Sequence, residues 1–200
     1  MRLYWFDSTN PHKVRLALEE LGLDYELVAM DMAKGAHKQA DYLAIHPRGK
    51  VPALEIDGGV CWDSNAALQY LGMREGRLWP HEPAGLTEAL SLLHMESSAF
   101  QEYARVYFFN RVLLPRTGRD GDPERIAKVA KKMSALLTLL DDRLGANDYL
   151  LGDFSVVDCA FAPWLPMLDL DPHPRVMAWH QRLTARKSWS ASQTPIPNAP

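Results

Sequence analysis

The sequence of 200 residues predicts two domains, an α/β domain followed by an all-helical domain. Short apolar runs alternate with helical periodicity only in residues 1–75, and after residue 86 the pattern is helical throughout. Between them, residues 76–85 carry glycine, prolines and a Trp-Pro step, which is typical of a linker. We therefore expect a helical domain over 86–189 and a flexible Ser- and Pro-rich tail over 190–200.

The chain begins with a predicted strand, helix and second strand. An apolar run over 3–6 predicts the first strand, and a similar run over 25–29 the second. Between them, residues 11–21 have helical apolar spacing, with Pro11 in the first turn and Gly22 as the C-terminal cap. A βαβ unit of this kind has parallel strands joined by a right-handed crossover.

The rest of the first domain reads as a polar segment, a hairpin and a helix. Residues 31–47 are polar, with a helical turn near 40–44. The run Asp57-Gly58-Gly59 predicts a tight hairpin between strands 52–56 and 60–62, and a helix follows over 63–74. This order of elements describes a thioredoxin-like domain.

Four helices are predicted for the second domain, over residues 86–114, 123–144, 155–165 and 174–186. Asp122 is placed to cap the second of them. Ser155 and Asp158 have the spacing of a capping box at the start of the third, with Asp in place of the usual Glu.

Composition and charge exclude several classes of function. The net charge of −3 and the lack of a basic stripe argue against a nucleic-acid partner, and the run at Lys128, Lys131 and Lys132 is typical of a solvated helix face. Cys61 and Cys159 are too few and too far apart for a disulfide framework and are expected as buried thiols in a reducing compartment. Without a signal peptide, a membrane span or a metal-ligand cluster, the chain is expected in the cytoplasm with no membrane partner and no metal.

Two motifs point to a peptide-like ligand. Pro52 lies in a predicted strand although it has no N–H to donate, and a cis Val51–Pro52 bond would expose the N–H and C=O of Val51 to a ligand. Asp63 and Ser64 open a helix, whose free N–H groups favour an anion. Together they predict one strand-like contact and one carboxylate pocket.

Four segments together resemble the cytosolic glutathione transferases of the bacterial, serine-type, theta- or phi-like kind. They are residues 8–15, 37–54, 63–71 and 150–158, and they occur in the family order. The resemblance implies the thioredoxin-like and all-helical fold, glutathione as co-substrate without another cofactor, a hydrophobic electrophile and a homodimer. Gln69 and Met73 are candidates for the dimer interface.

The resemblance places thiol activation in the loop after the first strand. Ser8 is the first choice to donate a hydrogen bond to the glutathione thiolate, with Thr9 and Asn10 as alternatives. Such residues also cap helices, which is the alternative role for this loop. Tyr4 lies inside the strand and is expected to pack in the core.

The resemblance also assigns binding roles. Ser64 is expected to bind the γ-glutamyl carboxylate and Asp63 the γ-glutamyl ammonium, although an ordinary N-cap pair fits the same residues. His37, Lys38 and Lys50 are candidates for the glycine carboxylate. Val51 and Pro52 would present the strand-like backbone contact.

Tyr103 and Tyr107, one helical turn apart, are predicted to line the second-substrate pocket, because a phenol suits a half-wet surface. The leading function is conjugation of glutathione to an electrophile by a transferase in a detoxification role. The alternatives are a glutathione-dependent disulfide or peroxide reductase and a non-catalytic transferase-like protein-interaction module.

Overall fold

The computed structural model describes residues 1–194, which form two units. The first unit contains residues 1–79 and 184–194, and the second contains residues 80–183. The C-terminal helix therefore belongs to the first unit, so the expected end of the helical domain at residue 189 is wrong.

A four-stranded sheet organises the first unit in the order β2-β1-β3-β4. Its strands are β1 (Arg2–Trp5), β2 (Glu26–Ala29), β3 (Ala53–Ile56) and β4 (Gly59–Cys61). β1 and β2 are parallel, as the predicted βαβ unit requires, while β3 is antiparallel to both β1 and β4. The hairpin at Asp57 and Gly58 joins β3 to β4 as predicted.

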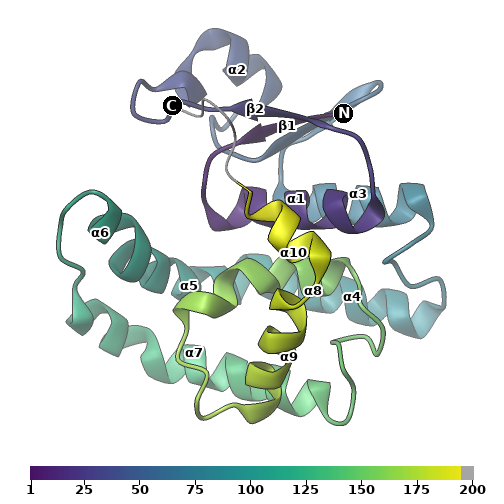
Figure 1. The fold of residues 1–200 in the computed structure, drawn as a ribbon, viewed down its shortest axis with the longest axis vertical. Coiled ribbons are helices and arrows are strands. Elements are labelled where there is room, and N and C mark those ends of the chain that lie inside the picture. The colour runs from purple at the N-terminus through teal and green to yellow at the C-terminus, as the bar shows by residue number, and fades with distance from the viewer. Residues whose placement is uncertain (195–200) are drawn as a thin grey trace. The chain divides into compact units, whose positions relative to one another are not determined.

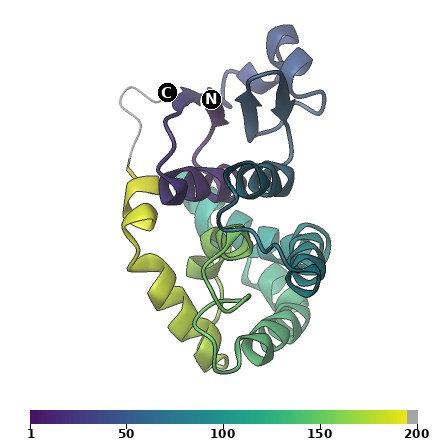
Figure 2. The same cartoon turned by 90° about the vertical axis from the view of Figure 1, so that its right-hand side faces the viewer.

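Helices cover both faces of this sheet (Figures 1 and 2). α1 (Thr9–Leu21) and α3 (Ser64–Glu75) pack side by side on one face, and α2 (Ala40–Ile45) lies on the other. Because side chains alternate along β1, Tyr4 points to the α2 side and packs with Met30 and Tyr42. Tyr4 is 9 % exposed, so it is a core residue as expected.

The C-terminal helix α10 (Lys187–Ser192) packs against α1. Arg15, 5 % exposed, donates hydrogen bonds to the carbonyls of Ala191 (3.2 Å) and Thr194 (2.8 Å). Glu20 binds Arg186 in a short ion pair and accepts from the Ser188 hydroxyl at 2.5 Å. The expected flexible tail is thus helical up to Ser192, and its last six residues, 195–200, lie outside the described residues.

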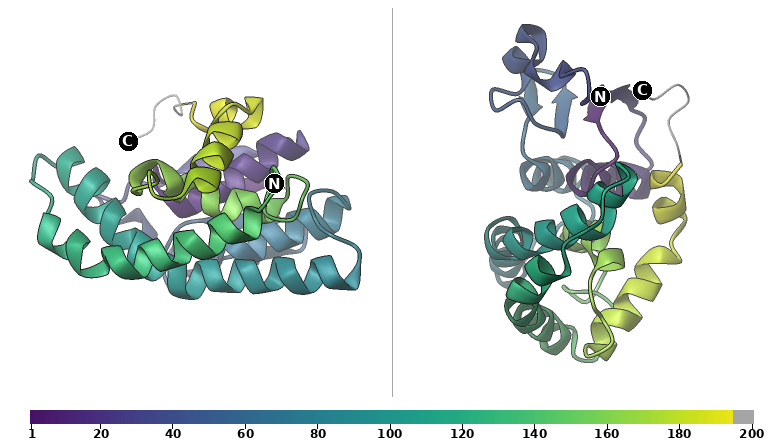
Figure 3. Two further views of the ribbon diagram at one scale, coloured as in Figure 1. Left: turned by 90° about the horizontal axis from the view of Figure 1, so that it is seen from below. Right: turned by 90° about the vertical axis from the view of Figure 1, so that its left-hand side faces the viewer.

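Two long helical runs dominate the second unit and lie alongside one another (Figure 3). The first run consists of α4 (Pro83–Met95), a π-helical turn at Glu96–Phe100, α5 (Gln101–Phe108), a second π-helical turn at Phe109–Leu113, and α6 (Leu114–Arg116). The second run is α7 (Pro123–Leu144), which Asp122 caps as predicted.

The remaining helices of the second unit are α8 (Val156–Phe161), the 3-10 turn Ala162–Met167 and α9 (Pro174–Thr184). Ser155 and Asp158 form the predicted capping box at the start of α8. Asp158 is fully buried and also accepts hydrogen bonds from the Leu150 N–H and the Trp179 indole. The described residues, 1–194, include no helix long and apolar enough to cross a membrane.

Candidate functional site

Three chain segments meet at one edge of the sheet in the first unit. β1 runs into the Ser8 loop, and its Tyr4 pairs with Ala53, the first residue of the antiparallel β3. β4 runs antiparallel to β3, so its end leads to Asp63 beside the start of β3. The topology therefore brings the Ser8 loop, the Pro52 turn and the start of α3 to the same edge.

Ser8 occupies the N-cap position of α1, yet its side chain makes no capping hydrogen bond. Its hydroxyl instead donates to the Phe6 carbonyl at 3.4 Å, a long contact. An N-cap side chain accepts from the N–H of the second or third helical residue. The third here is Pro11, which has none, and the N–H of the second, Asn10, makes no capping bond to Ser8. Capping is therefore not the role of the Ser8 hydroxyl.

The two alternatives to Ser8 follow it in the first turn of α1. Thr9 is 7 % exposed and packs into the interior, whereas Asn10 is half-buried. The structure thus separates the three polar residues by accessibility, with Ser8 and Asn10 more accessible than Thr9.

The Val51–Pro52 peptide bond is cis. Within residues 1–194, neither the N–H nor the C=O of Val51 makes a hydrogen bond. Pro52 itself is buried, and β3 begins one residue later. The backbone of Val51 is thus an unused donor and acceptor pair at the edge of the sheet.

Gly49 packs the segment carrying His37 and Lys38 against the Pro52 turn. Its φ is +55°, and a Cβ there would lie 2.5 Å from the His37 carbonyl oxygen, so a side chain does not fit. The Lys38 ammonium donates to the Gly49 carbonyl at 3.4 Å, and the Tyr42 hydroxyl donates to the Lys50 carbonyl at 2.5 Å. Sequence reasoning gave Gly49 no role, because its contact with His37 is formed only when the chain folds.

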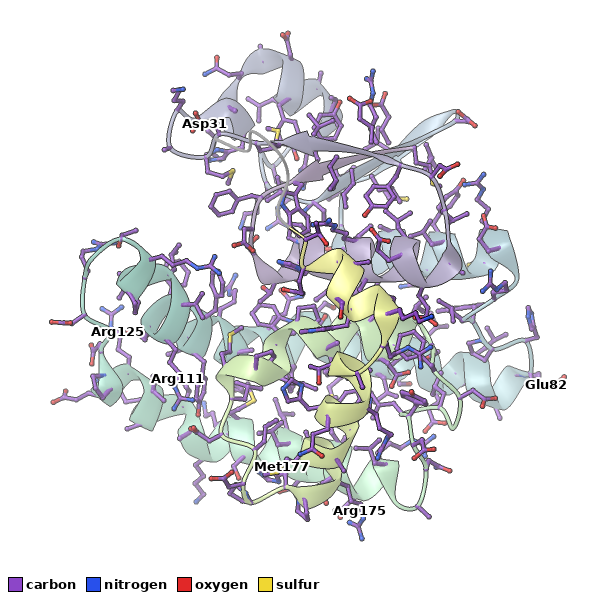
Figure 4. All side chains as sticks on the ribbon, in the orientation of Figure 1. Asp31, Glu82, Arg111, Arg125, Arg175 and Met177 are labelled. Carbon is purple, nitrogen blue, oxygen red and sulfur yellow. The ribbon has the colours of Figure 1, made fainter. Side chains whose placement is uncertain are left out.

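The segment with His37 and Lys38 begins at Asp31, labelled in Figure 4. His37 is half-buried, and its Nδ1 atom has no hydrogen-bond partner among the described residues. Lys38 and Lys50 are both exposed. Three potential cationic groups therefore lie on the segments that Gly49 joins.

Asp63 and Ser64, at the start of α3, differ in their hydrogen bonds. Asp63 caps the helix, and its Oδ1 atom accepts from the N–H groups of Asn65 (2.9 Å) and Ala66 (3.3 Å). Ser64 is 4 % exposed, and its hydroxyl makes no hydrogen bond with the residues that the structure describes. The N-cap role foreseen for this pair holds for Asp63 only, which leaves the hydroxyl of Ser64 available.

An aromatic pair flanks this site. His46 is 3 % exposed, its ring centroid lies 5.6 Å from that of Trp62, and burial lowers the pKa of its imidazole. Trp62, immediately before Asp63, is 45 % exposed. Sequence reasoning did not assign a role to either residue, and the exposed Trp62 could not be distinguished from a core aromatic in a short strand.

The two predicted second-substrate tyrosines pack within the second unit. Tyr107 is 1 % exposed, the Arg111 guanidinium lies 4.9 Å from its ring centroid, and burial raises the pKa of its phenol. The Lys132 ammonium lies 5.4 Å from the ring centroid of Tyr103, which is half-buried. The expectation of a half-wet surface is therefore wrong for Tyr107, because Arg111, labelled in Figure 4, covers it.

The cysteines and potential metal ligands do not form a further centre in the described part of the chain. Cys159 is buried as expected, whereas Cys61 is half-buried and its thiol has a pKa raised by burial. In residues 1–194, no three His, Cys, Asp or Glu side chains are grouped so as to hold a metal ion.

Two family models match the chain. Residues 1–73 match the N-terminal domain of glutathione S-transferases, and residues 123–182 match the C-terminal domain. The glutathione S-transferase GstB of Escherichia coli is 35% identical over 190 residues, which cover 90% of this chain and 90% of that protein.

A further relative and a solved structure extend the comparison. The disulfide-bond oxidoreductase YfcG of Escherichia coli is 30% identical over 198 residues, covering 92% of this chain and 90% of that protein. The structure of a glutathione S-transferase I bound with lactoylglutathione has a TM-score of 0.83 and 26% identity, covering 96% of this chain and 97% of that one.

Proposed function

Because this chain belongs to the glutathione S-transferase family and is a glutathione transferase, we propose that Ser8 activates the glutathione thiol for attack on a hydrophobic electrophile. This is the serine-type mechanism, with Asn10 and Thr9 as the alternative donors. The proposal rests on one observation: the Ser8 hydroxyl lies at the N-terminus of α1 and does not cap that helix.

The energetic requirement matches what this loop offers. A free thiol has a pKa near 8.5, and lowering it by about two units requires about 2.7 kcal/mol of preferential stabilisation of the thiolate. One hydroxyl donor and the N-terminal end of α1, a helix of 13 residues, supply interactions of that order.

The rest of glutathione has matching groups at the same edge of the sheet. The unused N–H and C=O of Val51, presented beside Pro52, suit the peptide backbone of the ligand. The Ser64 hydroxyl and the first N–H groups of α3 suit the γ-glutamyl carboxylate. The exposed Asp63 keeps its Oδ2 atom for the γ-glutamyl ammonium while Oδ1 caps the helix.

The glycine carboxylate at the other end of glutathione requires a cation. Lys38 and Lys50 are exposed, and His37 lies on the same segment as Lys38. We assign the carboxylate to this group, with Lys50 favoured by its position next to the Pro52 turn.

The reaction balances without a further cofactor. The thiol proton leaves to solvent, and the thiolate sulfur forms a bond to the electrophilic carbon. In a substitution, the leaving group departs with its bonding electron pair. In an addition, the substrate takes up a proton at the neighbouring carbon.

We further propose a cytoplasmic homodimer. The exposed side of α3 carries Met73, which is 65 % exposed, one turn after the half-buried Gln69. An adaptable apolar side chain of this kind suits an interface between copies. Sedimentation at micromolar concentration should give about twice the chain mass, and a monomer with full activity would contradict this proposal.

The thiol-activation test compares Ser8→Ala with Asn10→Ala. We expect Ser8→Ala to lower conjugation turnover by about tenfold or more with little change in glutathione affinity, because the lost hydrogen bond acts on the thiolate. The pKa of the bound thiol, followed by thiolate absorbance, should rise. Unchanged turnover in Ser8→Ala together with loss of activity in Asn10→Ala would reassign the donor to Asn10.

A second activity, glutathione-dependent disulfide reduction, is favoured by the relative named as a disulfide-bond oxidoreductase. In that reaction two glutathione molecules are oxidised to one glutathione disulfide while the substrate disulfide is reduced to two thiols. An aryl halide conjugation assay run beside disulfide and peroxide assays on one preparation ranks the activities.

A further inference from the structure

The turn that carries Ser8, Thr9 and Asn10 is bridged by a side-chain pair that lies outside the proposed site. The His12 Nε2 atom lies 2.9 Å from the Asp7 Oδ1 atom. Asp7 precedes Ser8 and His12 comes after Pro11, so the Asp7–His12 pair spans the turn from one side to the other.

The neighbours of His12 determine which of its ring nitrogens donates a hydrogen bond and which accepts one. The His12 Nδ1 atom lies 3.3 Å from the Gln193 amide nitrogen, and an amide nitrogen can only donate. Nδ1 is therefore the acceptor, and the neutral ring carries its proton on Nε2, which donates to Asp7. The His12 side chain is 12 % exposed, whereas that of Asp7 is 58 % exposed.

Packing holds the imidazole ring in this position. The ring centroid of His12 lies 4.5 Å from that of Trp5 at an interplanar angle of 70°, an edge contact. The Arg15 guanidinium lies 5.1 Å from the Trp5 centroid and binds the carbonyls of Ala191 and Thr194, next to Gln193. The groups around His12 thus come from β1, α1 and the C-terminal segment, and the charged ones are Asp7 and Arg15.

Just before helix α1, the backbone closes this turn with a short and a long hydrogen bond. Pro11 contributes no N–H, and the bond from the His12 N–H to the Ser8 carbonyl is long, at 3.3 Å. The short bond, 2.7 Å from the Ser8 N–H to the Phe6 carbonyl, fixes the start of the turn. The Asp7–His12 pair adds a side-chain bridge across the turn to this backbone closure.

We propose that Asp7 and His12 are positioning residues that hold the Ser8–Asn10 turn in the geometry that stabilises the thiolate. The inference rests on the proposed function, but it applies whichever of Ser8, Thr9 or Asn10 donates to sulfur. Neither Asp7 nor His12 is required to touch glutathione, so their effect falls on turnover and not on binding.

The test measures kcat, the KM for glutathione and the pKa of the bound thiol in four variants. His12→Ala removes the pair, His12→Gln keeps an N–H donor toward Asp7, and Asp7→Ala removes the acceptor. His94→Ala, an exposed histidine in the second unit, is the matched control. Near-UV circular dichroism and thermal unfolding report whether each variant folds.

We expect His12→Ala and Asp7→Ala to lower kcat by about tenfold while the KM changes less than about twofold, because a small displacement of a reacting group reduces turnover strongly. The pKa of the bound thiol should rise in both. His12→Gln should recover most of the lost turnover, and His94→Ala should behave as the unmodified chain.

Two results would overturn the inference while leaving the proposed function in place. One is a folded His12→Ala variant whose kcat and bound-thiol pKa equal those of the unmodified chain. The other is an unmodified kcat in Asp7→Ala, which decides the matter if His12→Ala fails to fold, since the exposed Asp7 contributes little packing. An unmodified chain that neither binds nor conjugates glutathione would instead refute the proposed function, and the inference with it.

Discussion

Ser8 and Ser155 each occupy the N-cap position of a helix, and their side chains are used in opposite ways. Ser155 at the start of α8 is buried, accepts from the Val157 N–H at 3.2 Å and donates to Asp158 at 2.9 Å. Ser8 at the start of α1 makes neither kind of bond. The third helical residue is Asp158 in one helix and Pro11 in the other.

The third helical residue accounts for one part of this difference. A carboxylate at the third helical position completes a capping box and occupies the serine hydroxyl. A proline there offers the hydroxyl no N–H, and the N–H of the second helical residue, Asn10, does not bind Ser8 either. Among the described residues the hydroxyl makes only its long contact to Phe6, and the N-terminal end of the helix is left for a ligand. The same residue type in the same position is structural in the second unit and proposed to be catalytic in the first.

Among the substitutions that test this comparison, we expect the largest effect on stability from one in the second unit. Asp158→Ala leaves the N–H groups of Leu150 and Ser155 and the indole of Trp179 without their shared acceptor. We expect a loss of about 3 kcal/mol or more in the free energy of unfolding, measured by urea denaturation. In contrast, Ser8→Ala should change that free energy by less than about 0.5 kcal/mol, and a similar loss in both variants would remove the distinction.

We expect smaller effects from substitutions of Asp63 and Ser64, and these effects should differ between the two residues. Ser64→Ala should raise the KM for glutathione by about tenfold with little change in kcat or stability, because its contact is remote from sulfur. Asp63→Ala should raise the KM as well and also lower the free energy of unfolding by about 1 kcal/mol, since Asp63 caps the helix. Steady-state kinetics and thermal unfolding of both variants check this, and a stability loss with unchanged glutathione affinity would reduce the pair to a helix cap.

The smallest effect is expected from a substitution of Pro11 itself. Pro11→Ala restores the N–H at the third helical position, so the Ser8 hydroxyl gains a partner for capping. In that background, Ser8→Ala should cost about 1 kcal/mol of unfolding free energy, against almost nothing in the unmodified chain. A double-mutant cycle measures this coupling, and a coupling energy of zero would show that Pro11 does not keep Ser8 free.

Local sequence signals predicted most of the fold. The Asp57-Gly58-Gly59 hairpin, the Asp122 cap and the Ser155 capping box depend on neighbouring residues only, and all three are confirmed. One regular helix was expected over residues 86–114, whereas the run from Pro83 to Arg116 contains two π-helical turns. They were not predicted because an apolar pattern hardly changes when a turn gains one residue. The α10 helix was missed because its contacts come from far away in the sequence: Arg15 binds the carbonyl of Ala191 in this helix and that of Thr194 just after it.

Less of the candidate site than of the fold could be predicted from the sequence. A proline within a strand indicated the turn at Val51 and Pro52, but nothing in the sequence showed that Gly49 packs against His37. The burial of Tyr107 depends on Arg111 and on the neighbouring helices, which a helical spacing cannot reveal. The Asp7–His12 pair likewise becomes visible only when the turn is folded.

The two π-helical turns have a consequence for how this chain can change in length. A π-helical turn contains one residue more than an α-helical turn, so removing one residue restores a regular helix and leaves the next helical segment in its original orientation. Ser97 and Ser98, both exposed, lie in the first of these turns. A single deletion there is therefore expected to be tolerated, whereas the same deletion in the middle of α7 would turn half of its buried face toward solvent.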